Sequence, residues 1–277
     1  MKILDNIKGS ITTKLSILVI IPWIALAIVF GFTDLEISKV IVNSDSLWGK
    51  TGRDYAYIPA YTMIAISFAI LIGSNFKDLK KQKIFGNLIN LYLFEIIYGY
   101  KRTITNLIAG EYWYVFLKIY FILGVIIFSI VTLKKDWKEF IQIAFVILLL
   151  TIFLTLFVDV TKQLCGRVRF KDLNSNYSNY TPWFLPPGPN SPHRSFPSGH
   201  TAQGWMFLPL LIIIKDREWK DPVKILLTTF VVGWGLFIAI SRVIIGAHYA
   251  SDVLFSTGAA AIITILLYKW FYLEKQN

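Results

Sequence analysis

Long apolar runs dominate this chain and limit what it can fold into. Each run approaches the roughly 20 residues that an α-helix needs to cross a bilayer. Charged residues make up 16% of the sequence, where a soluble domain has about 25%. The sequence therefore predicts an all-α fold, a polytopic transmembrane helical bundle of about eight segments. We expect these segments near residues 15–33, 57–75, 84–100, 113–133, 140–158, 199–214, 225–245 and 250–270.

The distribution of positive charge predicts which loops face the cytoplasm. More than half of the 28 Lys and Arg residues fall in alternate connections between the runs and at the two ends of the chain. The positive-inside rule therefore predicts that both termini are cytoplasmic and that residues 159–199 and 246–249 lie outside. The first run is too long for the hydrophobic part of a signal peptide, so we expect an uncleaved helix. The net charge of +11 does not indicate a nucleic-acid partner, because it lies in these short loops.

Two cations close the fifth run. Lys162 and Arg169 are seven residues apart in KQLCGRVRF, which is close to two helical turns, so they can share one face. Two cations on one face suit a ligand with several anionic oxygens, and Arg can bind phosphate through two hydrogen bonds. For such a pair taken alone, cations that snorkel to the membrane surface are the commoner explanation.

The sixth run opens with PSGH. Pro197 suits the first turn of a helix, and Gly199 lets a ligand approach the backbone closely. Ser198 can cap the helix or donate a hydrogen bond. His200 could give a proton to a ligand whose anionic group is held at the helix N-terminus. An ordinary helix cap with an interfacial histidine explains the same residues equally well.

A third cluster, SRVIIGAHYASD, joins the last two runs and contains Arg242, His248 and Asp252. A carboxylate four residues after a histidine can bind the imidazole, select its tautomer and leave the other nitrogen to attack a substrate. Arg242 would hold a phosphate beside it. The alternative is a structural ion pair at a helix turn. Paired charge in apolar surroundings is costly, and this cost favours a functional site.

Together and in this order, the three clusters resemble the motifs of the type 2 phosphatidic acid phosphatase superfamily. K-x6-R is Lys162–Arg169, PSGH is Pro197–His200, and SR-x5-H-x3-D is Ser241–Asp252. All three lie on one predicted membrane face. The resemblance implies a catalytic membrane domain with a six-helix phosphatase core in residues 84–277, preceded by two membrane helices in residues 1–83.

The resemblance also implies a role for each of these residues. His248 would be the nucleophile that forms a phosphohistidine, Asp252 would orient it, and His200 would protonate the leaving oxygen. No metal and no other cofactor would be needed. The residues that would hold the phosphoryl oxygens are Lys162, Arg169, Ser198, Gly199 and Arg242.

One position departs from the family pattern, which usually has proline after the Arg of the first motif. This chain has Phe170 there. Because proline mainly restricts the backbone, we expect the chemistry to survive and the path of the following loop to differ. Arg167 is an extra cation nearby, and we expect it to be solvated in the loop in preference to a contact with the site or the substrate. Cys165, the lone cysteine, is expected to be inert.

These expectations combine into a membrane-embedded phosphatase. It would hydrolyse lipid phosphates or polyprenyl diphosphates at the extracytoplasmic face of, we expect, a prokaryotic plasma membrane, with membrane lipids as its surroundings. A transporter or a non-catalytic membrane protein that binds an anion would explain the cations but needs neither histidine. A haloperoxidase-like vanadate enzyme shares the three motifs, but the membrane spans argue against it.

Two charges within predicted spans form a separate expectation. Glu95 lies in the run at 84–100 and Lys118 in the run at 113–133. Because charges inside spans usually face the bundle interior, we expect the two residues to pair across their helices. The alternative is a re-entrant or interfacial 84–100 segment with a solvated Glu95.

Overall fold

The computed structural model describes residues 2–90, 92, 112–132 and 134–274, and every regular element in these ranges is helical. The predicted all-helical fold with long apolar helices is confirmed, whereas the number of eight membrane segments stays a prediction. Within the described ranges, the stretches long and apolar enough to cross a membrane are Ile11–Ile41, Leu47–Gly73, Trp137–Asp172, Pro222–Ile244 and Ala250–Glu274.

The chain packs as two compact units. The first combines Met1–Ala56 with Ile152–Asn277, and the second is Tyr57–Thr151. Helix α6 (Ile141–Cys165) begins in the second unit and ends in the first. The expected division at residue 83 separates two N-terminal membrane helices from the catalytic membrane domain. It is a division by function, and it stays a prediction. In the structure the first predicted run packs in one unit with the C-terminal helices, and the second predicted run does not.

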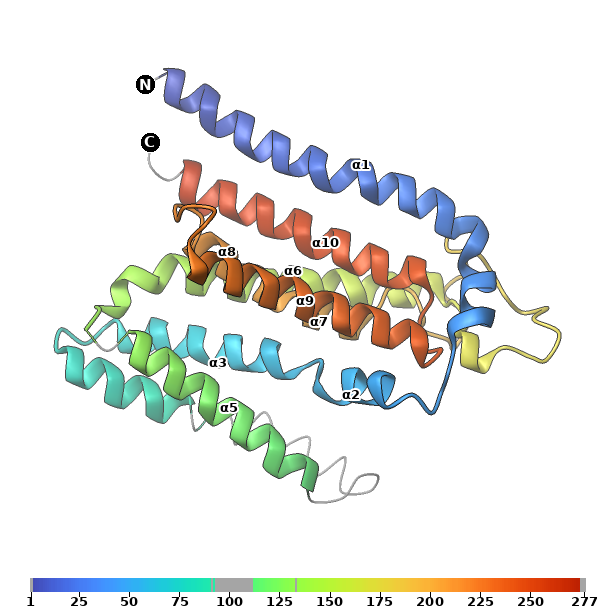
Figure 1. Ribbon diagram of the computed structural model, residues 1–277, viewed down its shortest axis with the longest axis horizontal. Coiled ribbons are helices and arrows are strands. Elements are labelled where there is room, and N and C mark those ends of the chain that lie inside the picture. Colours follow the sequence, from blue (N-terminus) through green and yellow to red (C-terminus); the bar gives the residue numbers. More distant parts are fainter. Residues whose placement is uncertain (1, 91, 93–111, 133, 275–277) are drawn as a thin grey trace. The chain divides into compact units, whose positions relative to one another are not determined.

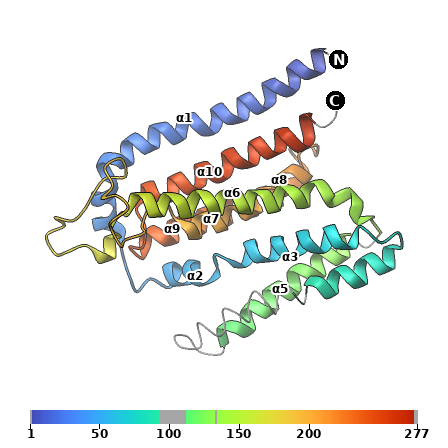
Figure 2. The same ribbon diagram turned by 180° about the vertical axis from the view of Figure 1, so that it is seen from behind.

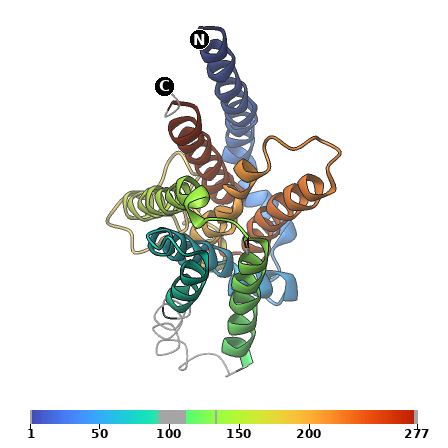
Figure 3. The same ribbon diagram turned by 90° about the vertical axis from the view of Figure 1, so that its left-hand side faces the viewer.

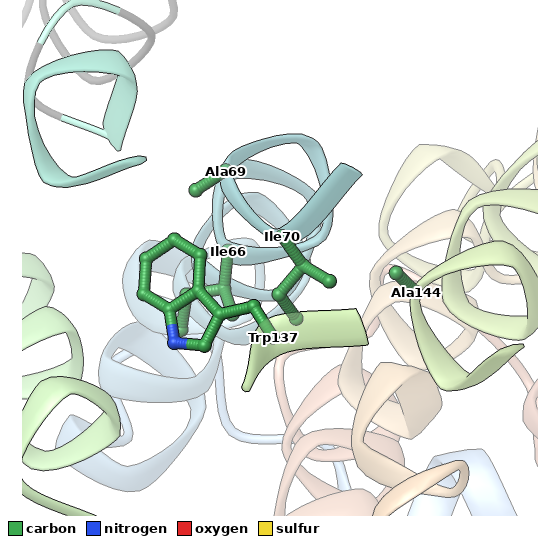
Figure 4. Packing of buried hydrophobic residues seen from close by; sticks show 5 residues of the cluster. All are labelled: Ile66, Ala69, Ile70, Trp137 and Ala144. Carbon is green, nitrogen blue, oxygen red and sulfur yellow. The ribbon is translucent and has the colours of Figure 1, made fainter. Parts of the chain in front are cut away.

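The second unit has a core around Trp137, whose side chain is fully buried. Helix α3 (Ile58–Gly73) packs against α5 (Tyr112–Val131) and against the short 3-10 helix η1 (Trp137–Phe140). The core around Trp137 contains Ile66, Ala69, Ile70 and Ala144 (Figure 4).

The third predicted run begins within a helix that is described through residue 90.

The predicted pair of Glu95 and Lys118 lies outside what the structure describes. Glu95 falls between the described ranges, and for Lys118 only the helical backbone of α5 is described. The pairing therefore stays a prediction.

In the first unit, helix α1 (Lys2–Ile41) lies along α10 (Ala250–Tyr268), as Figures 1 and 3 show. Trp23 of α1 packs edge-on against Phe255 of α10, with ring centroids 5.5 Å apart. A Cβ on Gly258 would come within 2.6 Å of the Trp23 ring. Glycine at this position therefore permits the close packing of α1 on α10.

Helix α9 (Pro222–Ile244) begins at a strong local signal. The Asp221 carboxylate accepts hydrogen bonds from the backbone N–H groups of Val223 and Lys224, at 2.8 and 3.3 Å. A proline in the first helical position has no N–H that would need a partner. Helix α2 (Leu47–Tyr55) packs against the C-terminal end of α9. Gly49 and Gly52 of α2 allow the two helices to approach closely there.

The sixth predicted run, 199–214, is an interrupted segment and not one continuous helix. It consists of α7 (Gly199–Gly204), the 3-10 turn η3 (Trp205–Phe207) and α8 (Leu210–Ile213). Pro209 lies between the last two. Because proline lacks an N–H and clashes with the preceding turn, a regular helix does not continue through it.

One end of the first unit gathers the three polar clusters. The loop 166–198 between α6 and α7 lies at this end, together with the turn 245–249 between α9 and α10 and the last turns of α1 (Figure 2). Residues 214–221 connect α8 to the opposite end of α9. This arrangement agrees with the prediction that the three motifs share one face, and the side of the membrane on which that face lies stays a prediction.

Gly246 shapes the turn that carries His248. Its φ is +67°, a left-handed conformation that L side chains rarely adopt. The Gly246 N–H donates to the Val243 carbonyl at 2.9 Å, and the Gly246 carbonyl accepts from Lys171 N–H at 3.1 Å. A Cβ on Gly246 would lie 3.0 Å from Val42 Cγ1. Both the backbone conformation and the packing therefore favour glycine.

Gly246→Ala is expected to lower the free energy of unfolding by about 1–2 kcal/mol, because alanine is strained in the left-handed region. Thermal unfolding in detergent measures the effect. The matched control is Gly233→Ala within α9, where an added Cβ meets no atom within 4 Å and alanine is expected to be neutral or slightly stabilising. Equal unfolding midpoints for the two variants would contradict the prediction.

Candidate active site

Lys162 lies in the last turn of α6, at a helix end formed by Gly166. Gly166 has φ +59°, and its N–H donates to the Lys162 carbonyl at 3.3 Å, which is the geometry of a left-handed helix cap. A Cβ on Gly166 would lie 2.2 Å from the Gly188 carbonyl oxygen. The Gly188 N–H in turn donates to the carbonyl of Cys165 at 3.0 Å. Through these contacts the chain changes direction at the end of α6, and the loop that follows stays close to this helix end.

The side chain of Lys162 reaches the second motif. A Cβ on Gly199 would lie 3.3 Å from Lys162 Nζ and 3.5 Å from Val158 Cγ1. The amine therefore lies over the backbone at the start of α7, and a larger side chain at position 199 would press on it. Glycine at this position leaves room for a ligand to contact both the amine and the backbone.

Arg169 completes the first motif at the start of the 3-10 turn η2 (Phe170–Asp172). Its side chain is half-buried, and its Nε is buried with no hydrogen-bond partner among the residues described. A buried donor of this kind is costly to leave unpaired, so it is suited to an anionic ligand. Phe170, which occupies the position of the usual proline, packs against the rings of Tyr177 and Tyr249, with centroids 5.9 and 6.5 Å away.

Ser198 links the second motif to the third. Its buried hydroxyl caps α7 by accepting hydrogen bonds from Thr201 N–H at 3.3 Å and from the Thr201 hydroxyl at 2.9 Å. Its backbone N–H donates to the Asp252 carbonyl at 3.1 Å, and its carbonyl accepts from the Ser256 hydroxyl at 2.8 Å. The ordinary capping role is therefore present in the structure, and a phosphate contact of Ser198 stays a prediction.

His248 and Asp252 lie side by side in the turn before α10 and in its first turn. The distance between His248 Nδ1 and Asp252 Oδ2 is 3.5 Å, which is longer than a formed hydrogen bond. Nδ1 has no hydrogen-bond partner within the described part of the chain, and a small movement of the ring would bring it into hydrogen-bond range of the carboxylate. Nε2 is then the imidazole nitrogen left for chemistry with a ligand.

The carboxylate of Asp252 is fully buried and firmly held. Its Oδ2 accepts hydrogen bonds from the Ser195 hydroxyl at 2.5 Å and from Tyr249 N–H at 3.0 Å. Its Oδ1 accepts from Arg167 Nη1 at 2.6 Å. These donors set the orientation in which the carboxylate meets His248.

Burial lowers the pKa of His248 to about 4, although Asp252 beside it acts in the opposite direction. The positive charges of Arg242 and Lys162 lower the pKa of His248 further. The imidazole is therefore neutral at pH 7, which is the protonation state that a nucleophilic histidine requires.

The lowered pKa of His248 predicts a pH profile for any reaction that needs the neutral imidazole. The acid limb of kcat/KM, which reports the free enzyme, is expected near pH 4 and not near the ordinary histidine value of 6.5. Between these values the unfolded chain binds the proton more readily, so stability also falls as the pH drops toward 4. Steady-state rates measured across this range, corrected for titration of the substrate phosphate, test the prediction. An acid limb near pH 6.5 that remains after the correction would contradict it.

Arg242 and His200 lie at the ends of two different helices. Arg242 is in the last turn of α9 and is almost fully buried. Its carbonyl accepts hydrogen bonds from the backbone N–H groups of Ala247 and His248, both at 3.2 Å. The backbone of Arg242 therefore holds the backbone of His248 in place. His200 is the second residue of α7, and its side chain is half-buried.

Arg167 is not solvated, so the expectation for this residue was wrong. Its side chain is 0% exposed and forms ion pairs with Asp34 at 2.9 Å and Asp252 at 2.6 Å. Its guanidinium carbon lies 4.0 Å from the centroid of the Tyr249 ring. The reason is tertiary, because α1 and α10 bring two carboxylates to the point where the chain leaves α6.

Asp34 on α1 is the functional candidate that sequence reasoning missed. Its side chain is fully buried and contacts Arg167 and Ser251. The sequence signal was weak, because Asp34 shares the end of an apolar run with Glu36 and Lys39, and charges at helix ends near a membrane surface are common.

A comparison with protein families matches the part of the chain that contains these residues. The model of the PAP2 superfamily matches residues 143–276. Residues 143–276 form a PAP2 superfamily domain. All the residues predicted for catalysis and phosphate binding lie inside this PAP2 domain, and Asp34 lies outside it.

A curated relative matches part of the chain. Phosphatidylglycerophosphatase B of Haemophilus influenzae (strain ATCC 51907 / DSM 11121 / KW20 / Rd) is 36% identical over 90 residues, which are 31% of this chain and 36% of that protein. The match thus spans little more than a third of the relative's length. No solved structure matches the chain.

Proposed function

We propose that this protein is a membrane-embedded lipid phosphatase that works through a phosphohistidine on His248. The observation that carries the proposal is the buried imidazole of His248, whose Nδ1 lies 3.5 Å from the fixed carboxylate of Asp252. Lys162 and Arg242 act on this imidazole electrostatically, as expected of cations that would surround a phosphoryl group. The PAP2 domain and the phosphatidylglycerophosphatase relative support the same reaction class.

The proposed reaction has two steps that use the same residues. First, His248 Nε2 forms a bond to phosphorus while the bond from phosphorus to the lipid oxygen breaks, and His200 gives that oxygen a proton. Next, water attacks phosphorus, the N–P bond breaks, and His200 takes a proton from the water. The charge on the phosphoryl oxygens would be neutralised by Lys162, Arg169 and Arg242, with further contacts from Ser198 and Gly199.

The proposed substrates are lipids that end in a phosphate monoester or a diphosphate. The site is built at the ends of long apolar helices, where a lipid head group meets the protein while its tail stays in the bilayer. Phosphatidylglycerol phosphate is the first candidate, because the relative is named for that activity. Phosphatidic acid and polyprenyl diphosphates share the chemistry. The charge pattern of the loops supports an extracytoplasmic site.

Phosphate release from purified protein in detergent and EDTA tests this function. The panel is phosphatidylglycerol phosphate, phosphatidic acid, undecaprenyl diphosphate and a soluble phosphate monoester, with identically purified His248→Ala protein as the background. We expect EDTA-resistant release from at least one lipid, absent from the variant. If labelled lipid binds but none of the four releases phosphate, the protein is an anion-binding membrane protein and the proposal fails.

A further inference from the structure

A carboxylate from outside the PAP2 domain is built into the site. Asp34 lies on α1, far before the start of the domain at residue 143. Its Oδ1 accepts a hydrogen bond from Ser251 N–H at 2.9 Å. Its Oδ2 accepts from Arg167 Nη2 at 2.9 Å and also from the Ser251 hydroxyl. Asp34 therefore contacts both the start of α10 and the guanidinium, and the catalytic steps described above use neither contact.

Arg167 connects Asp34 to Asp252 rigidly. Its Nη2 faces Asp34, while its Nη1 donates to Asp252 Oδ1 at 2.6 Å and to the Ser251 hydroxyl at 2.8 Å. Its Nε donates to the Thr181 carbonyl at 3.0 Å. Because the guanidinium is a planar fork, these bonds fix its orientation, and a shift at Asp34 would move the donor that holds Asp252.

The charges of this cluster suit a histidine that becomes positive during the reaction. The carboxylates of Asp34 and Asp252 each form an ion pair with the one cation of Arg167, and all three side chains are 0% exposed. With both carboxylates ionised, the cluster carries one net negative charge while His248 is neutral. When His248 gains positive character on forming a bond to phosphorus, that charge stabilises it at short range. Without Asp34, Arg167 would neutralise Asp252, and His248 would face a pair with no net charge.

We propose that Asp34 is a positioning residue, which acts through Arg167 to orient Asp252 and to supply the negative charge that His248 needs. Helix α1 is then part of the catalytic unit, although it lies outside the PAP2 domain. This role rests on the proposed function, in which His248 is the nucleophile.

Asp34→Asn tests the proposal, because asparagine keeps the shape and an acceptor for Ser251 but removes the charge. We expect kcat to fall about 10–100-fold, which is the range for loss of an outer hydrogen-bond partner that orients a metal-binding histidine. KM should stay within about twofold, since the cations that bind phosphate are untouched. The control is Glu36→Gln, two residues away on α1, whose side chain is 69% exposed and whose kcat should equal that of the wild type.

A double-mutant cycle separates positioning from a general loss of structure. In an Asp252→Asn background, Asp34→Asn should lower kcat by less than about twofold, because its effect passes through Asp252. Arg167→Lys keeps the positive charge but loses the planar guanidinium, so it should also lower kcat. If Asp34→Asn does not fold, Arg167→Lys takes its place in the test. Losses that multiply in the double variant, or wild-type kcat in Asp34→Asn or Arg167→Lys, would overturn the positioning role. Full activity of His248→Ala would instead overturn the proposed function itself.

Discussion

His248→Ala is expected to lower kcat by about 10⁴-fold or more, since removal of a covalent nucleophile leaves only binding and electrostatic effects. The buried imidazole is replaced by a methyl group, so the folded state should persist with a modest loss of stability. His193→Ala is the matched control. His193 is a half-buried loop histidine whose backbone N–H donates to the Ser191 hydroxyl at 3.3 Å. Alanine keeps this bond, and the replacement should leave kcat unchanged.

Trapping of the phosphoenzyme makes this prediction specific for the nucleophile. Wild-type protein mixed with lipid carrying radioactive phosphate and quenched in alkali should retain label, because an N–P bond survives alkali and is cleaved by acid. His248→Ala should retain none, whereas His193→Ala should retain as much as the wild type. Label on His248→Ala, or a loss of kcat of less than about tenfold, would contradict a nucleophilic His248.

Arg167→Met is expected to destabilise the first unit strongly. It leaves the carboxylates of Asp34 and Asp252 buried without their shared cation. Loss of one partner from a buried ion pair costs about 3–5 kcal/mol, because the remaining charge has no compensation. Methionine fills a similar volume, so the effect should come from the charge and not from a cavity. Unfolding in detergent, by heat or by denaturant titration, measures the free energy.

Arg217→Met provides the comparison for Arg167→Met. Arg217 forms an exposed pair with Asp221 at 2.7 Å, and its side chain is 48% exposed. An exposed pair contributes about 0–1 kcal/mol, so this variant should unfold close to the wild type. Equal stabilities of the Arg167 and Arg217 variants would mean that the buried carboxylates take up protons or water at no cost, which contradicts the account of the cluster.

Local patterns in the sequence were sufficient for the class of fold and for the motif residues. Apolar runs near bilayer length predicted the long membrane helices, because helix length and hydrophobic thickness are tied by geometry. The order of the three motifs predicted which of the 277 residues would carry the chemistry, and these roles stay predictions. The structure brings His248 beside Asp252, and Lys162 beside Gly199. The interruption of the run at 199–214 had a visible signal in Pro209, which marks a break.

The surroundings of the site were decided only by the tertiary structure. Arg167 and Asp34 are separated by 133 positions, and Ser251 and Asp34 by 217, so no local pattern could pair them. In sequence, each resembles an ordinary charged or polar residue near a membrane boundary. Burial turns these three residues into one network, because a charge removed from water must find its partner wherever packing places one. The sequence thus determined which residues make up the motifs, while the packing of α1 against α10 decided which buried groups lie around them.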